Sequence, residues 1–492
     1  MEKQSENIIH ELSTVRIKKV IINNFKSVKH GEITLSCGRR FVEAGTKSDI
    51  LGLYGQNGSG KSALIEALKI MQLAITGRRI YKECADFINI ETNQSDFEFY
   101  FDMQWPDGLA VEAMYKFGIT KKEIAKDEED EDKIDDSEEL ANPYRRVFDN
   151  SIVILNNEIL SFKIVSPVQL KENKKVIFDT STKNSAFRYT PSLKNILDEN
   201  VWKNMLPDLE VQKRIATKES RSAIFSSIKL LKGRCNKEAL EFKILDELRL
   251  YCSYYLTVIG TQSYGVVQLG GLLLFVGEGE YSIPINSSGV ALPKDALPSF
   301  EKEINSLNKV ISTIIPGTGI YVKELGPRLF KNKEGLQVAL MCTHQKEDKS
   351  IIEIPVHYES DGIKRMISFL LALIKAFDQK SFTIVVDELD SGIFEYLLGE
   401  LLQAFEESGR GQFIFTSHNL RPLEVINKDF LYFTTTNPDN RYVQMKKVHT
   451  TNNLRSMYFR EILTNSTQDE EIYSGTKRYK IVDAIRHAGE VE

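Results

Sequence analysis

A glycine-rich segment near the beginning of the chain has the residue types that bind phosphate groups. The pattern GxxxxGK[ST] is matched by Gly55, Gly60, Lys61 and Ser62, after the apolar stretch ILGLY and before a helix-forming sequence. In such a loop, consecutive backbone N–H groups converge on the phosphates, and a Cβ at the glycines would block their approach. We expect Lys61 to reach the β- and γ-phosphates of a nucleotide and Ser62 to bind Mg²⁺, beside the positive end of the following helix.

Two adjacent carboxylates follow a second apolar strand, FTIVV (382–386). Asp387 would hold the Mg²⁺ directly or through water, and Glu388 is placed to polarise the attacking water. Adjacent acidic residues at a strand end can also be plain surface charge. A buried strand in a chain that already has a phosphate loop favours the metal site.

A third apolar strand, GQFIFTSH (411–418), ends in Ser417 and His418. A single histidine is more often structural than catalytic. We expect this strand to lie beside the one that bears Asp387, which would direct His418 toward the γ-phosphate. We therefore favour a catalytic role for His418.

The segment YESDGIKRMISFLLALIKAF (358–377) offers a second phosphate-binding element, because Ser360 and Gly362 stand at the beginning of a helix. One nucleotide already has its binding loop at 55–62. We therefore expect this element to act in trans, on a nucleotide held by another subunit. The alternative is a simple helix cap, for which serine is a common residue.

The elements that must position these residues can be read from the apolar patterns. The segment 16–35 predicts two short strands with a turn at His30-Gly31, and the segments around the PDG turn (106–108) predict another antiparallel pair. A helix should follow the phosphate loop to about Thr76, and the region from about 190 to 260 should be helical. Later, helix 362–377, strand 382–386, the helix FEYLLGELLQAFEES and strand 411–418 alternate. That order predicts a parallel sheet with crossover helices.

Bulk composition limits the classes of protein. A chain of 492 residues is expected to form two or three lobes. The net charge is −5, with 64 basic and 69 acidic residues, so no general basic excess indicates nucleic-acid binding. We expect a cytoplasmic protein without a signal peptide or membrane partner. The acidic run 121–139 predicts an exposed loop, with a docking site for a basic partner as the alternative. Five scattered cysteines predict free thiols in a reducing compartment: Cys37, Cys84, Cys235, Cys252 and Cys342.

Together these motifs resemble the ATP-binding-cassette ATPases, specifically their SMC/Rad50/RecF-like branch. The segment NNFKS (23–27) ahead of the phosphate loop is typical of that branch. So are ESDG in place of the transporters' LSGGQ, the block VVDELD and the terminal TSH. More narrowly, the chain resembles the AAA15-type ATPases, which often occur in bacterial anti-phage systems beside a nuclease or other toxic effector.

The resemblance implies a role for each matching residue. Asp387 would be the Walker B metal ligand, Glu388 the catalytic base and His418 the switch histidine. Asp390 would lie in the D-loop, and Ser360 and Gly362 in the signature. The cofactors would be ATP and Mg²⁺, with the phosphate loop contributing Asn57, Gly58, Ser59, Gly60, Lys61, Ser62 and Ala63. ATP would lie between two subunits, which implies a homodimer or a larger even assembly.

The resemblance also implies the fold and its division along the chain. We expect an α/β ABC-type ATPase head, with a mixed antiparallel lobe, a parallel-sheet lobe and a mainly helical insert. The head would comprise 1–165 and 336–440, the insert 166–335 and a C-terminal extension 441–492. No long heptad run exists, so coiled-coil arms are not expected, and SGIFEYLL (391–398) departs from the HP that many relatives have there. Gln72 and Gln104 are both candidates for the Q-loop glutamine, and nothing resembles a fused TOPRIM or HNH nuclease.

We therefore predict an ATPase that acts as a sensor or regulator in anti-phage defence, with a separately encoded effector. The alternative is a RecF/Rad50-like ATPase of DNA repair or maintenance, for which the basic stretches KLLKGR and KKVIINNFKSVK are slight support. A second alternative is a scaffold that binds ATP without hydrolysing it. A transporter ATPase is disfavoured by the split cassette and the ESDG signature.

Overall fold

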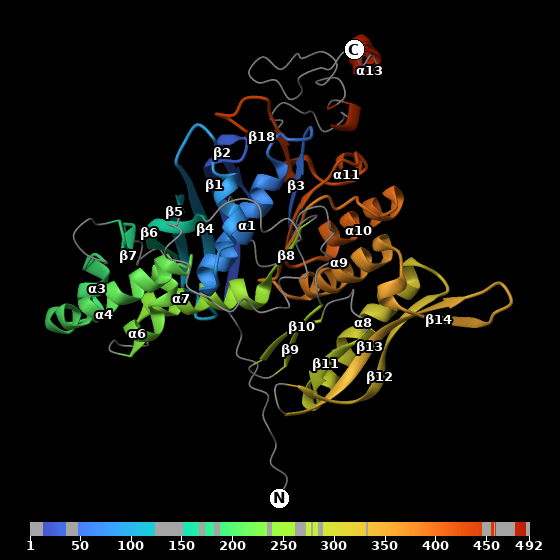
Figure 1. The fold of residues 1–492 in the computed structure, drawn as a ribbon, viewed down its shortest axis with the longest axis horizontal. Helices are drawn as coiled ribbons and strands as arrows, with labels where there is room; N and C mark the ends of the chain where they lie inside the picture. Colours follow the sequence, from blue (N-terminus) through green and yellow to red (C-terminus); the bar gives the residue numbers. More distant parts are fainter. Residues whose placement is uncertain are drawn as a thin grey trace, which may run out of the picture.

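The computed structural model describes residues 13–35, 48–123, 151–166, 173–181, 187–233, 239–260, 272–276, 279–283, 289–330, 333–444, 454–456, 458 and 478–488. Within these ranges the chain forms two neighbouring lobes, each built on a six-stranded sheet (Figure 1). The predicted α/β architecture, with one antiparallel lobe and one parallel lobe, is confirmed.

The first lobe is an antiparallel sheet with the strand order β2-β1-β4-β5-β6-β7. Its strands are β1 (Thr14–Phe25), β2 (Val28–Thr34), β4 (Gln94–Gln104), β5 (Ala110–Glu123), β6 (Ser151–Ser166) and β7 (Lys175–Asp179). Apolar residues alternate along them because one face of the sheet is buried. Along β4, for example, Phe97, Phe99 and Phe101 are fully buried, whereas the residues between them are partly exposed. The predicted PDG turn joins β4 to β5.

The predicted turn at His30-Gly31 is wrong. The strands β1 and β2 are joined at Lys26-Ser27, since Phe25 pairs with Val28, and Gly31 lies within the ladder opposite Ile22. The glycine is there because of a distant contact: a Cβ on Gly31 would lie 2.4 Å from the ring of Tyr442. Sequence reasoning treated a close-packing glycine as a turn glycine.

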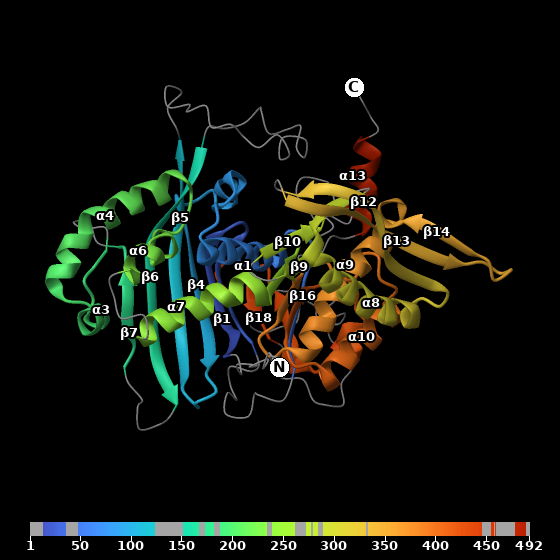
Figure 2. The ribbon, with the colours of Figure 1, turned by 90° about the horizontal axis from the view of Figure 1, so that it is seen from below.

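Helices cover the buried face of this sheet. They are α1 (Lys61–Thr76), α3 (Pro191–Ile196), α4 (Glu199–Lys218), α5 (Ala223–Ser226), α6 (Ile228–Lys232) and α7 (Leu240–Leu250). Figure 2 shows α3, α4 and α6 at one end of the molecule and α1 nearer its centre. The apolar residues of α1 pack both on this sheet and on the strands of the second lobe. The helix that follows the phosphate loop is therefore packed between the two lobes.

The second lobe is built on a sheet with the order β18-β17-β3-β16-β15-β8. Its strands are β3 (Asp49–Tyr54), β8 (Leu256–Ile259), β15 (Thr383–Val386), β16 (Gln412–Thr416), β17 (Leu431–Thr434) and the short antiparallel β18 (Tyr442–Val443). The strands from β17 to β8 are parallel, as the alternation of strands and helices predicted. Both faces are covered, which explains why β15 and β16 are buried along their whole length and mainly apolar.

The period of two along each strand divides the side chains of this sheet between two cores. Leu51, Val385 and Ile414 face α1 and the antiparallel lobe. Ile384 and Phe413 face the other side, where α9 (Asp361–Asp378), α10 (Glu395–Ser408) and α8 (Leu297–Ile314) pack. The parallel sheet is thus the middle layer of the molecule.

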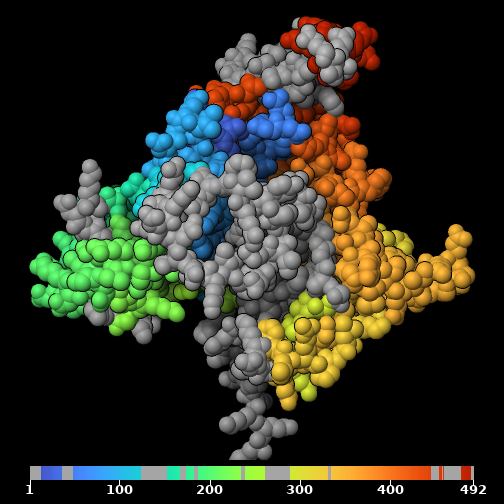
Figure 3. Space-filling model, viewed as in Figure 1, coloured from blue at the N-terminus to red at the C-terminus, as the bar shows by residue number. Residues whose placement is uncertain are grey.

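A β-arm extends from the second lobe. The strands β11 (Val290–Pro293), β12 (Thr318–Phe330), β13 (Lys333–Gln345) and β14 (Ile351–Pro355) form one antiparallel sheet in which β13 pairs with all three others. A separate hairpin joins β9 (Leu272–Val276) and β10 (Gly279–Ile283). In the space-filling view the end of the arm that includes β14 projects beyond the body of the molecule (Figure 3).

The chain between residues 166 and 335 contributes to both sheets of the head. β7 is the edge strand of the antiparallel sheet, and β8 is the edge strand of the parallel sheet beside β15. The β12–β13 hairpin crosses the expected division at 335/336. Helices are the more abundant element in this region, but its strands are shared with the head.

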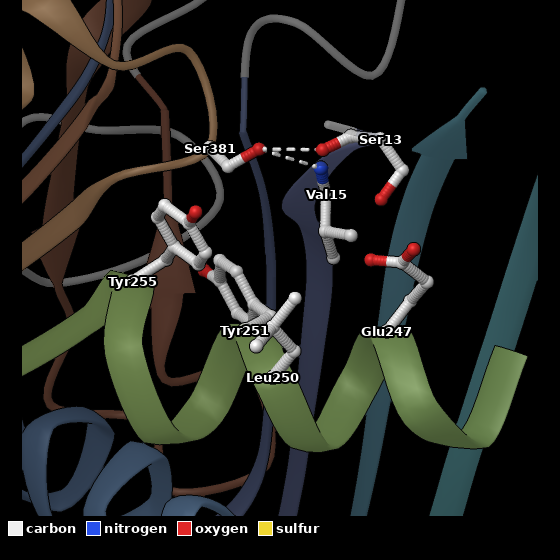
Figure 4. Close-up of a pocket in the computed structure, with 7 residues that line it drawn as sticks. All are labelled: Ser13, Val15, Glu247, Leu250, Tyr251, Tyr255 and Ser381. Carbon is white, nitrogen blue, oxygen red and sulfur yellow. Dashed lines mark hydrogen bonds between the residues drawn. The ribbon is translucent and has the colours of Figure 1, made fainter. Parts of the chain in front are cut away.

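The N-terminal strand ties the two lobes together through buried hydrogen bonds. Ser381 Oγ accepts from Val15 N over 3.1 Å and donates to Ser13 O over 3.2 Å, beside a small cleft lined by Tyr251 and Tyr255 (Figure 4). The side chain of Gln412 makes a second bridge. Its Oε1 accepts from Ile17 N and its Nε2 donates to Ile17 O, both over 2.8 Å.

Replacing Gln412 by leucine should destabilise the fold. Gln412 is fully buried, and the substitution would leave the N–H and C=O of Ile17 without partners. Each buried unpaired group costs about 1–3 kcal/mol, so the free energy of unfolding should fall by about 2–6 kcal/mol. Urea denaturation measures this loss. Gln104→Leu, at an exposed strand end, is the control and should change it by less than about 0.5 kcal/mol.

Several expectations concern residues outside the described ranges. The exposed loop expected for 121–139 is wrong for residues 121–123, which end strand β5 and pair with β6. The rest of the acidic run, from residue 124 onward, lies outside the described ranges, and so do Cys37 and Cys235. The other cysteines, Cys84, Cys252 and Cys342, are free and buried. The expected C-terminal extension contains the helix α13 (Arg478–Ala488). Among the described helices, none has the length and apolar character needed to cross a bilayer.

Candidate nucleotide-binding site

The phosphate loop has the expected setting between a buried strand and a helix. β3 ends at Tyr54, and α1 begins at Lys61 immediately after Gly60. Gly58 and Gly60 have positive φ angles of 74° and 98°, which favour glycine. Among the residues that the structure describes, none lies within 4 Å of a Cβ built on Gly58, which is itself exposed.

The last strands of the parallel sheet support the loop from beneath. Thr434 Oγ1 donates to Ser59 Oγ over 2.5 Å, and Ser59 Oγ in turn donates to Gln56 O over 2.6 Å. Tyr442 OH donates to Gly60 O over 2.8 Å. Ser59 is buried and stabilises the conformation of the loop, whereas Asn57, Gly58 and Ser62 are exposed.

Lys61 lies inside the loop. Its Nζ donates to Gly55 O over 2.8 Å and to Gln56 O over 2.9 Å, and only 6% of the residue is exposed. Burial lowers the pKa of Lys61, and the nearby carboxylates of Asp387 and Glu388 oppose that shift. An ammonium group held on carbonyl oxygens is well placed to move to the stronger charged acceptors of a phosphate.

Asp387 and Glu388 end β15 at the same edge of the sheet as the phosphate loop. β16 lies between β15 and β3, so the carboxyl ends of the three parallel strands converge there. Asp387 is 5% exposed, and its Oδ1 accepts from Thr416 Oγ1 over 2.6 Å. The same hydroxyl oxygen accepts from Glu388 N over 2.8 Å. Thr416 therefore fixes both acidic residues relative to each other.

Glu388 has a left-handed backbone with φ 48°, an uncommon conformation for a residue with a side chain. Arg365, on α9, holds the peptide groups on either side of this bend. Its Nη2 donates to Asp387 O and, over 2.7 Å, to Glu388 O. Arg365 is 5% exposed, and burial lowers its pKa while Glu388 and Asp387 oppose that shift. Strained backbone of this kind is concentrated at functional sites.

The structure places His418 beside Asp390, as β16 lies next to β15. The contact is made by the backbone, because His418 N donates to Asp390 Oδ1 over 3.1 Å. The histidine is exposed at the end of its strand. Asp390 thus orients the segment that carries His418.

Ser360 and Gly362 lie at the beginning of α9, where Ser360 is the N-cap. Its Oγ accepts from Ile363 N over 3.3 Å, which is the helix-cap role considered above, and the residue is exposed. Gly362 packs on Gly392, in the segment that follows Asp390, since a Cβ on Gly392 would lie 2.8 Å from Gly362 Cα. Within the described residues, no hydrogen bond joins Ser360 or Gly362 to the phosphate loop of the same chain.

Within the described part of the chain, neither candidate for the Q-loop glutamine reaches this edge of the sheet by a hydrogen bond. Gln72 Nε2 donates to Cys252 O over 2.9 Å and to Leu256 O over 2.7 Å, so Gln72 supports the turn that leads into β8. Gln104 is exposed at the end of β4. The strand β8 does contact the acidic pair. Ile259 O, at the end of β8, accepts a hydrogen bond from Asp387 N over 2.9 Å.

Comparison with known families decides the assignment. The family AAA_15, described as an AAA ATPase domain, matches residues 16–421. The chain belongs to the AAA_15 family. No curated protein matches the sequence.

The AAA_15 chain is also similar to solved structures at low sequence identity. The SMC head domain from Thermotoga maritima is 15% identical, with coverage of 88% of this chain and 99% of that chain and a TM-score of 0.34. An Smc head with a coiled coil and joint from Pyrococcus yayanosii is 11% identical, with coverage of 91% and 99% and a TM-score of 0.39. The recombination mediator RecF with ATP is 11% identical, with coverage of 82% and 94% and a TM-score of 0.33.

Sequence reasoning missed the residues that hold this AAA_15 site in shape. Thr434 and Tyr442 support the phosphate loop, and Thr416 and Arg365 support the acidic pair. Each acts through a contact between segments distant in sequence, such as the 382 residues between Gly60 and Tyr442. Their residue types are ordinary for the strands and the helix that carry them, so no local pattern indicated these roles.

Proposed function

We propose that this AAA_15 protein binds and hydrolyses MgATP in a site completed by a second copy of the chain. The observation that carries the proposal is the convergence of a phosphate loop and a buried, threonine-held acidic pair at one sheet edge. Burial lowers the pKa of Lys61, and the charges of Asp387 and Glu388 act against that shift, which is consistent with one shared site. This is the arrangement that phosphoryl transfer to water requires.

In this proposal each side chain has a defined task. Lys61 Nζ would exchange its hydrogen bonds to the carbonyl oxygens of its own loop for hydrogen bonds to the β- and γ-phosphates. Ser62 and Asp387 would hold Mg²⁺, which neutralises developing negative charge on the phosphate oxygens. Glu388 accepts a hydrogen bond from the attacking water and orients it in line with the bond that breaks. His418 would contact the γ-phosphate from the neighbouring strand end.

The composite site is supported by the exposure of Ser360 at the N-terminus of α9. A helix of 18 residues presents unpaired N–H groups and the positive end of its dipole there. Since Ser360 is not hydrogen-bonded to the phosphate loop of its own chain, we propose that it serves the nucleotide of a partner copy. A homodimer is the smallest assembly that satisfies this geometry.

Phosphate release with Mg²⁺ and ATP tests the proposal directly. Steady release by the purified protein, together with a mass that doubles with a non-hydrolysable ATP analogue, supports it. Binding without release would leave the scaffold alternative in its place. No nucleotide binding by the folded protein would overturn the assignment of the site.

We further propose that the ATPase is a sensor or regulator in anti-phage defence and acts on a separately encoded effector. This step is supported by the sequence resemblance alone. The alternative role on DNA is weakened by ion pairs, because Lys18 Nζ lies 2.6 Å from Glu112 and Lys19 Nζ lies 2.6 Å from Glu32. A nuclease or toxin gene beside this one would support defence. Stimulation of the ATPase by double-stranded DNA would favour the alternative.

Replacing Thr416 by valine should lower ATP hydrolysis by about 10–100-fold, the usual effect of removing a group that orients metal ligands. The substitution keeps the shape of the side chain but removes the partner of Asp387 Oδ1 and Glu388 N. Thr416→Ser keeps the hydroxyl and should retain most activity. Equal rates for the valine and serine variants would show that Thr416 does not position the acidic pair.

A further inference from the structure

A cluster of three donor side chains lies directly before the proposed signature segment. Cys342 and His344 are two residues apart on β13, so both project from the same face of the strand. Glu359 approaches them from the turn that follows β14 and is the residue before the helix cap Ser360. The cluster therefore joins β13 of the β-arm to the beginning of α9.

The donor atoms are close enough to share one ligand. A sulfur, an imidazole nitrogen and a carboxylate oxygen from these residues all lie within 4.8 Å of one another. His344 Nε2 lies 2.6 Å from Glu359 Oε1, and His344 Nδ1 lies 3.4 Å from Thr318 Oγ1. Around a tetrahedral Zn²⁺, with bonds of about 2.0–2.3 Å, donor atoms are separated by about 3.5 Å. Side-chain adjustments of about 1 Å would bring these donors to that spacing.

The cluster is largely buried and could present two negative charges to a cation. Cys342 is 1% exposed and the Glu359 side chain 8%, whereas the His344 side chain is 30% exposed and leaves one side open to solvent. Burial, reinforced by the charge of Glu359, raises the pKa of the Cys342 thiol to about 12, so a bound metal would have to displace the thiol proton. A cation that displaces this proton to solvent would meet a thiolate, a carboxylate and a neutral imidazole, and would balance their two negative charges.

We propose that Cys342, His344 and Glu359 form a binding site for one zinc-like divalent cation, with solvent as the fourth ligand. The mixed sulfur, nitrogen and oxygen donors match the preferences of Zn²⁺, and hard cations such as Mg²⁺ prefer oxygen ligands alone. The site differs from the nucleotide site, whose metal ligands would be Ser62 and Asp387.

A cation in this site would fix the entry to α9. Glu359 is joined through one peptide bond to Ser360, so its coordination would link β13 to the cap of the helix that carries Arg365. The segment 359–363 should then exchange its backbone amide hydrogens more slowly in the presence of Zn²⁺. This effect does not depend on ATP binding or hydrolysis.

Cobalt substitution gives the sharpest test, because a Co²⁺–thiolate bond produces its own charge-transfer absorption. The full-length protein, freed of metal and nucleotide, should bind one Co²⁺ per chain with this absorption, and Zn²⁺ should displace it. Cys342→Ser should abolish the absorption. Cys84→Ser is the matched control, since Cys84 is also buried and free, and it should leave the absorption unchanged.

A second variant is needed because Cys342→Ser changes a buried residue and could lose the absorption by misfolding. His344→Gln changes a half-exposed side chain and should weaken Zn²⁺ binding by at least about tenfold, measured by competition with a chromophoric chelator. Absence of the cobalt absorption in the folded wild-type protein would overturn the proposal. So would its persistence in Cys342→Ser, or wild-type Zn²⁺ affinity in His344→Gln, and the cluster would then be only a hydrogen-bonded link.

Discussion

Lys61→Ala is expected to abolish detectable ATP binding. The ammonium group of Lys61 is the cation of the phosphate loop, and it already lies among backbone carbonyls where the terminal phosphates would compete for it. Charge-assisted hydrogen bonds to phosphate are about twice as strong as neutral ones, and alanine offers none. Equilibrium binding of a fluorescent ATP analogue in the presence of Mg²⁺ measures the loss.

The control for this variant lies two turns further along α1. Lys69 is on the same helix, and its Nζ lies over the ring of Tyr81 at 5.2 Å from the centroid. Lys69→Ala removes the same charge and should bind ATP as the wild type does. Wild-type ATP affinity in Lys61→Ala would contradict the assignment of the phosphate loop.

Glu388→Gln should bind ATP normally but hydrolyse it about 10²–10⁴-fold more slowly, the usual contribution of a general base. Glutamine has the same shape, so the hydrogen bonds that Thr416 and Arg365 make to the backbone here should remain. The variant should therefore accumulate as an ATP-bound dimer. Single-turnover phosphate release measures the rate, and light scattering in the presence of MgATP measures the mass.

A surface glutamate seven residues later provides the comparison. Glu395→Gln, in the exposed first turn of α10, also removes one negative charge and should leave both rate and mass unchanged. If Glu388→Gln released phosphate at the normal rate, another residue would be the base.

The parallel sheet and the strand ends were predictable because their signals are local. β15 and β16 are short apolar runs that end in polar residues, and helices separate them along the chain. Their neighbouring positions follow from the general preference of such units for a parallel sheet. Asp387 and His418 could be placed at one edge on these grounds alone.

The elements that sequence reasoning missed depend on contacts across the fold. β8 follows a helical region directly, and only its pairing with β15 makes it a strand of the parallel sheet. The turn at His30-Gly31 was wrong because Tyr442, far away in sequence, requires the glycine. Thr416 and Arg365 have ordinary residue types for a strand and a helix, and their roles arise from hydrogen bonds to the acidic pair. No local pattern contains that information.

The buried guanidinium of Arg365 would couple the two ATP sites of the proposed dimer. The helix that carries it also presents Ser360, which would rest on the nucleotide of the partner. A displacement of that helix would pull on both carbonyls that shape the bend at Glu388. Loss of one nucleotide would therefore loosen the backbone bend that positions Glu388 in the opposite subunit. The two proposed sites would then hydrolyse ATP in a coupled way.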